Sequence, residues 1–349
     1  MAGHRARDRG VTALTEPSAG SVASSLRSTT AGWRLPALLV TKAIASGMFM
    51  LMAATWILGL APFDRRTALV GNGVALVFLA ITTVLLVADL ERPERFLRIL
   101  TRPQWKSWLT RGAFILIGFS LVCTAWFALE LGARLGWVPE GVAEAARVPL
   151  MLLGFPLALL TAIYTAFLFQ QCEGRDLWQS RLMPWHMGVQ AVMAGGAALG
   201  AALLLFQLHL PAWSHLGLLV VWSTFSLAGA LDLALRWTEV TMRHNTSNGS
   251  QAAWILRNGP ERLTWRASML IGGFAVLAPV TYGAIALNWF YGQLGDSVDP
   301  ETLALLNPQF SALISNWLSL WPLAGILALV GLFLYESAII KAGQDVPNA

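Results

Sequence analysis

Charged side chains are scarce in this sequence. Asp, Glu, Lys and Arg make up 12% of the 349 residues, whereas they make up about one quarter of an ordinary soluble domain. Hydrophobic residues account for 56% of the chain. This balance excludes an ordinary soluble protein and indicates an integral membrane protein, for which we expect no nucleic-acid partner.

Cysteine is equally scarce. The chain contains only Cys123 and Cys172, and neither belongs to a CxxC motif. Iron–sulfur clusters are normally held by four cysteine thiolates in closely spaced motifs. We therefore expect no iron–sulfur cluster in this chain, and any such cluster would belong to a partner subunit.

The N-terminal 33 residues lack the features of a secretory signal. They include the basic run HRARDR and are rich in Ser, Thr, Ala and Gly, but they contain no apolar core and no cleavage site. The sequence therefore predicts a disordered basic tail over residues 1–33.

Long apolar runs occupy most of the remaining chain. A membrane-spanning helix needs about 20 apolar residues. Eight runs satisfy this length, and they cover residues 36–60, 68–88, 112–136, 148–171, 184–208, 214–236, 266–291 and 316–340. The predicted fold class is an all-α membrane protein with eight transmembrane helices, comprising a membrane domain over 34–341 and a short tail over 342–349.

The basic residues are distributed unevenly between the two sides of the membrane. With eight spans both termini lie on one side, here named side A, and 19 of the 24 Lys and Arg residues fall on it. The opposite side, side B, receives four, and Lys42 lies inside the first span. The positive-inside rule therefore places side A and both termini in the cytoplasm of a bacterial cell, with the chain in its inner membrane.

Small residues recur within several spans at the spacing of one helical turn. Ala43 and Gly47 lie in the first span, and Gly196 and Gly200 lie in the fifth. Small side chains at this spacing let helix backbones approach closely in lipid. The sequence therefore predicts tight packing of these helices.

The stretch ADLERPERFLRILTRPQW, residues 88–105, holds an unusual excess of charge. Asp89 falls at the end of the second span, where an ionisable group is costly unless it is paired or hydrated. We expect Arg92 or Arg95 to be its partner. A solvated connection facing the lipid headgroups is the plainer interpretation of the same residues.

This stretch and the residues that follow it resemble the signature region of the NrfD-like family of polysulfide reductase membrane subunits. The matching residues are Asp89, Leu90, Arg92, Pro93, Arg95, Phe96, Arg102, Pro103, Ser107, Trp108 and Gly112. Glu91 departs from the family motif, which has Gly at that place. Residues 163–184 and 335–347 resemble two further stretches of the same family.

The resemblance implies a membrane anchor of a respiratory oxidoreductase complex, with its helices in two four-helix bundles. Such a subunit is not catalytic alone toward the soluble substrate. It binds quinone or quinol, either menaquinone or ubiquinone, and it holds no haem. It exchanges electrons with a four-cluster ferredoxin-like iron–sulfur subunit, which connects to a molybdopterin catalytic subunit.

The candidate quinone site lies near side A. Asp89 is expected to relay protons and Tyr164 to donate to a quinone carbonyl, while Lys42 or Arg92 stabilises negative charge. Lys42 is equally well explained as a side chain that reaches the headgroups, and Tyr164 as a packed helix residue. A docking face for the iron–sulfur partner is expected at Arg95, Arg98, Arg102 and Lys106. We expect no metal site.

Four other polar residues receive structural interpretations. Asp232 is expected to pair with Arg236, which lies four residues further along the same helix. His186 is expected to face the headgroups and Glu239 to be solvated at the end of its span, as is Glu173.

Three other functions are compatible with part of this pattern. A cytochrome b-type protein needs pairs of histidines inside its helices, but only His186 of the five histidines lies near a span interior. An ion or proton transporter would show related interruptions in its two halves, and Pro156 and Pro322 do correspond. A purely structural anchor would need no chemistry at Asp89.

Overall fold

A computed structural model of the chain describes residues 32–89, 101–172, 175–206, 215–244, 246–294 and 300–346. All regular elements in these ranges are helices. They are α2 (Arg34–Ile57), α3 (Arg65–Ala88), α5 (Trp108–Arg134), α6 (Glu140–Gln170), α7 (Met183–Leu205), α8 (His215–Thr241), α9 (Ser247–Arg257), α10 (Arg262–Leu294) and α11 (Pro300–Asp345). The predicted all-α class is confirmed.

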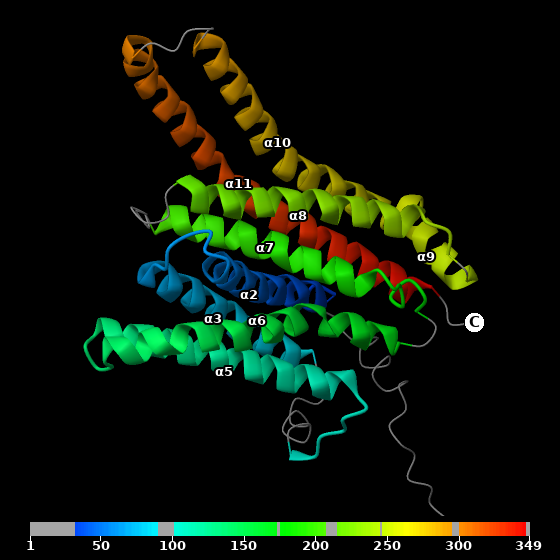
Figure 1. Cartoon of the computed structure of the whole chain (residues 1–349). Helices are drawn as coiled ribbons and strands as arrows, with labels where there is room; N and C mark the ends of the chain where they lie inside the picture. Colours follow the sequence, from blue (N-terminus) through cyan, green and yellow to red (C-terminus); the bar gives the residue numbers. More distant parts are fainter. Residues whose placement is uncertain are drawn as a thin grey trace, which may run out of the picture.

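Seven of the described helices are long and apolar enough to cross a membrane: α2, α3, α5, α6, α7, α10 and α11. The chain is therefore a multi-pass membrane protein. The sixth predicted span corresponds to α8, which is not among the seven and carries Asp232, Arg236 and Glu239 in its second half. Most of these helices run alongside one another, and α8 lies beside α7 (Figure 1).

Helix α2 lies at the centre of the molecule and packs against α3, α6, α7 and α11. Its contact with α7 depends on glycine. A Cβ at Gly47 would lie 1.7 Å from the carbonyl oxygen of Ala191, and a Cβ at Gly195 would lie 2.1 Å from the carbonyl carbon of Gly47. The close approach predicted from small residues is confirmed at Gly47. Gly200 is equally close-packed, against the Trp222 ring.

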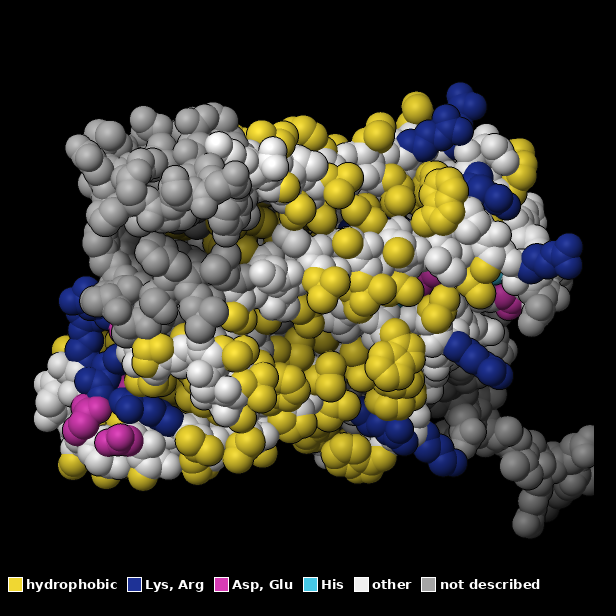
Figure 2. All heavy atoms as spheres, turned by 45° about the horizontal axis from the view of Figure 1, so that its top comes forward, with side chains coloured by type: hydrophobic (Ala, Val, Ile, Leu, Met, Phe, Trp, Pro, Cys, Tyr) yellow, Lys and Arg dark blue, Asp and Glu magenta, His cyan; other side chains and the backbone are white. Residues whose placement is uncertain are grey.

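Charged side chains on the face shown in Figure 2 gather toward its two ends, and apolar side chains dominate the band between them. At the side B end, Glu130 is buried between two arginines. Arg65 Nε lies 2.9 Å and Arg147 Nε 2.7 Å from its carboxylate oxygens, and Glu140 joins both arginines. This network ties the start of α3 to the hairpin of α5 and α6.

At the side A end, the connection between α6 and α7 holds the end of α11. Arg175 donates through Nη1 to the carbonyl oxygens of Gly343, Gln344 (2.8 Å) and Val346 (2.9 Å). The Trp178 indole donates to the Ile339 carbonyl at 3.1 Å. A cation at a helix C-terminus satisfies carbonyls that have no partner within the helix. The short helix α9 also lies at this end, in contact with α8, α10 and α11.

Candidate functional site

A buried lysine forms the first part of the site. Lys42, on the central helix α2, is only 2% exposed, and its ammonium group donates to the Thr165 hydroxyl of α6. The same group lies 4.9 Å from the centre of the Tyr164 ring. Thr165 in turn donates to the Met187 sulfur of α7 at 3.1 Å. Lys42 therefore points into the protein, and the expectation that it reaches the headgroups is wrong.

Tyr164 stands beside this lysine because α5 leaves room for its ring. A Cβ at Gly112 would lie 2.3 Å from the ring atom Cδ2, so no larger residue fits there without displacing Tyr164. The Tyr164 hydroxyl is buried and has no hydrogen-bond partner within the described part of the chain. The Tyr164 hydroxyl can therefore donate a hydrogen bond to the carbonyl oxygen of a bound molecule, and the Lys42 ammonium group lies near the same ring.

Asp89 lies apart from this pair, at the C-terminal cap of α3. It interacts electrostatically with Arg34 at the start of α2, whose guanidinium donates to the Ala88 carbonyl at 3.0 Å. Burial raises the pKa of Asp89 above its ordinary value, and the positive charge of Arg34 partly opposes this shift. The structure thus brings Lys42 and Tyr164 together and places Asp89 at the C-terminal cap of α3.

A second buried cluster lies between α7, α8 and α11, and His186 is at its centre. The His186 side chain has no exposed surface, and both of its ring nitrogens face carboxylates of α8. Nε2 lies 2.9 Å from Asp232 Oδ1, and Nδ1 lies 3.0 Å from Glu239 Oε2. The expectations that His186 faces the headgroups and that Glu239 is solvated are therefore wrong.

Arg236 and Tyr335 complete this cluster. Arg236 Nη2 lies 2.5 Å from Asp232 Oδ2, which confirms the predicted ion pair, and Nη1 donates to the Gly331 carbonyl at 3.1 Å. The Tyr335 hydroxyl donates to Glu239 Oε2, and its ring lies 4.8 Å below the Arg236 guanidinium. We name Asp232, Arg236, Glu239 and Tyr335, together with the histidine, the His186 cluster.

Gln190 and Glu336 connect the His186 cluster to Lys42. Gln190 Nε2 lies 3.3 Å from His186 Nε2, and the Gln190 side chain also hydrogen-bonds Glu336. Glu336 is buried and interacts electrostatically with Lys42. Hydrogen bonds therefore run from His186 to Glu336, and the last step from Glu336 to Lys42 is an electrostatic interaction.

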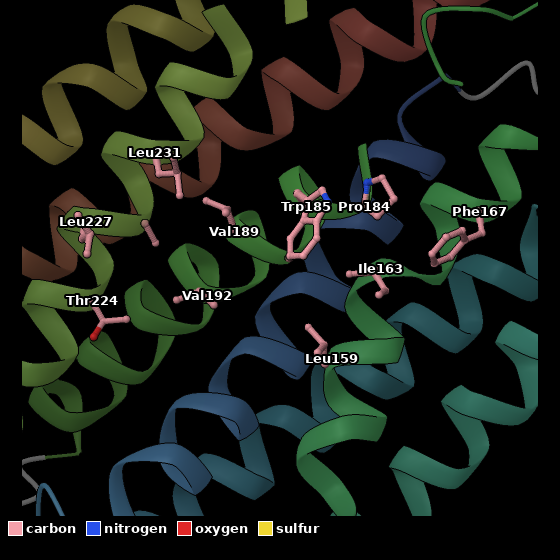
Figure 3. Close-up of a pocket in the computed structure, with 12 residues that line it drawn as sticks. Leu159, Ile163, Phe167, Pro184, Trp185, Val189, Val192, Thr224, Leu227 and Leu231 are labelled. Carbon is pink, nitrogen blue, oxygen red and sulfur yellow. The ribbon is translucent and has the colours of Figure 1, made fainter. Parts of the chain in front are cut away.

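An apolar groove of about 670 Å³ opens between α6, α7 and α8 on the outside of these polar groups (Figure 3). Leu159, Ile163, Trp185, Leu227 and Leu231 are among its lining residues. Trp185 and Leu227 are largely exposed, so the groove opens toward the lipid. Its lining is apolar apart from one threonine hydroxyl, which bonds within its own helix.

Four residues with sequence-based predictions, three of them site residues, lie outside the ranges that the structure describes. They are Arg92, Arg95, Arg98 and Glu173. Arg102 and Lys106, the described members of the predicted docking face, are exposed at side A.

Sequence reasoning missed the role of α8. Asp232, Arg236 and Glu239 recur at intervals of four and three residues, so they occupy one face of the helix. That pattern is a readable signal for a buried polar face. Among the described residues, however, no group of three or more His, Cys, Asp and Glu is arranged to hold a metal ion.

A sequence model of the family described as "Polysulphide reductase, NrfD" matches residues 38–254, which is more than half of the chain. The matched region contains both Lys42 and Tyr164 as well as the first four members of the His186 cluster in chain order. No curated protein matches the chain.

Proposed function

Because the chain belongs to the NrfD family of polysulphide reductase membrane subunits, which work with partner redox subunits, we propose that it exchanges electrons between the membrane quinone pool and such a partner. The quinone is a mobile substrate that takes up two electrons and two protons when it is reduced. The chain's own residues must hold the head group and move its protons.

The buried pair of Lys42 and Tyr164 is the observation that carries this proposal. The Tyr164 hydroxyl, which lacks a partner within the described chain, is free to donate to one quinone carbonyl. The Lys42 ammonium group beside it stabilises negative charge that develops on that oxygen. Both groups sit in a water-poor interior, where such interactions are stronger than at the surface.

The groove between α6, α7 and α8 suits the apolar tail of the same molecule. Its volume lies within the range of ordinary ligand sites, and Ile163 on its wall is adjacent in sequence to Tyr164. We propose that the tail lies in this groove while the head group reaches Tyr164 on the other side of α6. Asp89 remains the proposed proton relay, and Arg92 remains the alternative to Lys42 for stabilising negative charge.

The proposal extends to the membrane topology of the chain and to its partner subunits. We propose that α8 is the eighth span and that the helices form two four-helix bundles in the bacterial inner membrane, with both termini in the cytoplasm. A four-cluster ferredoxin-like subunit would dock at side A near Arg102 and Lys106, and would lead to a molybdopterin subunit. The exposure of these two basic residues supports such a docking face.

Binding of decylubiquinone or menadione to the purified chain in lipid nanodiscs tests the central claim. Quenching of tryptophan fluorescence reports the dissociation constant. We expect Tyr164→Phe and Lys42→Met each to raise this constant about tenfold, because each removes one hydrogen-bonding or charged contact worth roughly 1–2 kcal/mol.

Tyr282→Phe, on α10, makes the same chemical change away from the site and should leave the dissociation constant unchanged. Absence of binding by the wild-type chain would support the alternative of a purely structural anchor. Equal binding by all three variants would remove Lys42 and Tyr164 from the site.

A further inference from the structure

The His186 cluster is not among the residues proposed to hold the head group, and all five of its side chains are buried. We propose that this cluster is a proton-exchange site for the quinone reaction, in which the His186 ring is the group that gains and loses the proton. This inference rests on the proposed function and extends it to residues of α7, α8 and α11.

The geometry around the imidazole ring supports this role first. Both ring nitrogens lie within 3.0 Å of a carboxylate oxygen, one from Asp232 and one from Glu239. Imidazole has two N–H groups only when it is protonated, so the surroundings favour the imidazolium form. The cluster therefore holds a proton at a defined atom inside the membrane domain.

The charge balance within the cluster is a second argument for proton exchange at His186. Arg236 neutralises Asp232 at 2.5 Å, and a protonated His186 neutralises Glu239. Loss of the proton from His186 leaves one buried carboxylate without a counter-charge, which is costly in a medium of low polarity. Because of this cost, the His186 ring takes up another proton after it has released one.

A third argument for proton exchange is that polar groups adjoin the cluster on two sides. Toward the quinone pocket, Gln190 contacts both His186 and Glu336, and Glu336 interacts electrostatically with Lys42. Toward side A, Glu239 lies two residues before the end of α8, and its Oε1 has no hydrogen-bond partner in the described part of the chain. Helix α9 packs against α8 and α11 at this end.

The proton transfer balances when quinone is reduced by two electrons from the partner redox subunit. An N–H bond of His186 breaks, Glu336 carries the proton, and an O–H bond forms at the oxygen held by Tyr164 and Lys42. The Glu239–Tyr335 pair then returns a proton to the ring from side A, and the cycle repeats for the second oxygen. Quinol oxidation runs the same transfers in reverse.

Selective ¹⁵N labelling of histidine provides a test that does not depend on turnover. The chain has five histidines, so the NMR signal absent from His186→Gln identifies His186. We expect this signal to be that of an imidazolium and to change when decylubiquinone is added. His244→Gln removes a histidine from the connection between α8 and α9 and should leave the His186 signal unaltered.

Turnover of the complex purified from native membranes provides the second readout. His186→Gln should lower quinone reduction at saturating quinone at least tenfold and change its pH profile, while the dissociation constant for decylubiquinone stays within twofold. Glu239→Gln should also change the pH profile. His244→Gln should behave as wild type.

The possible failures are distinguishable. If decylubiquinone binds the wild-type chain but the His186 signal does not respond and His186→Gln turns over normally, the proton-exchange role is wrong and the proposed function stands. If His186→Gln lowers only the thermal stability, the cluster is a structural ion network and the inference also fails. If neither decylubiquinone nor menadione binds the wild-type chain, both fall together.

Discussion

Gly112 and Tyr164 face each other across the contact between α5 and α6, where the ring occupies the space of a side chain. Gly112→Ala forces the ring to move, because the new methyl group would lie 2.3 Å from it. We expect quinone affinity to fall about tenfold, as it would for a misplaced hydroxyl. Gly118→Ala on the same helix is the matched control, since its nearest neighbour is Leu157 at 3.8 Å. Equal affinities of both variants, measured by fluorescence quenching, would show that the ring is not positioned by Gly112.

Asp89 provides a prediction on pH dependence. Burial raises its pKa, so the folded protein binds this proton more tightly than the unfolded chain, whose ordinary aspartate pKa is about 3.9. The wild type therefore loses stability relative to Asp89→Asn as the pH rises from about 4 through the raised pKa. Thermal unfolding at pH 4 and pH 8 should show a larger advantage of Asp89→Asn at pH 8. A larger advantage at pH 4 would contradict the assigned shift.

Among the contacts between helices, the contact of α2 with α7 should be the most sensitive to a larger side chain. Gly195→Ala should destabilise the protein by about 1–3 kcal/mol, because the added methyl group would meet the backbone of Gly47 at 2.1 Å. Gly273→Ala, on α10, has no atom within 4 Å of its new Cβ and should leave the stability unchanged or slightly higher. Unfolding in denaturant measures both. Similar stabilities for the two variants would argue against the close approach.

The hairpin of α5 and α6 depends on Glu130 in a different way. Glu130→Gln leaves Arg65 and Arg147 without their buried counter-charge and should cost about 3 kcal/mol of stability. Glu144→Gln makes the same change at an exposed position of α6 and should have little effect. Chemical unfolding followed by tryptophan fluorescence compares them. A neutral Glu130→Gln would mean that water screens this network.

Hydropathy was sufficient to predict the seven apolar helices but not the short helix α9, and the resemblance to the family suggested Lys42 and Tyr164 among the candidate site residues. α2, for example, covers Arg34–Ile57 where the sequence predicts 36–60. Hydropathy does not determine which helix faces meet. His186 looked like a headgroup residue because it is near the start of α7, and only the packing of α7 against α8 and α11 brings it to Glu239.

The proposed orientation of the whole molecule, with side A in the cytoplasm, rests on the distribution of basic residues and is open to direct measurement. Both native cysteines are buried, so a single added cysteine can report its side of the membrane. With an impermeant maleimide on intact cells, Ala145→Cys at the side B end of α6 should react, whereas Ser250→Cys on α9 should react only after cell lysis. The reverse pattern would place side A outside the cytoplasm.

The central position of α2 has a consequence for how the protein is made. This helix is the most buried of the seven apolar helices, yet it is the first to leave the ribosome. Its glycine partner on α7 follows about 150 residues later, which corresponds to roughly 10–30 s of synthesis. During that interval Lys42 lacks its final neighbours on α6 and the helix must wait in lipid or in the insertion machinery. The packing of α2 is therefore completed only after α7 has been synthesised. We expect a chain that is truncated before α7 to be degraded.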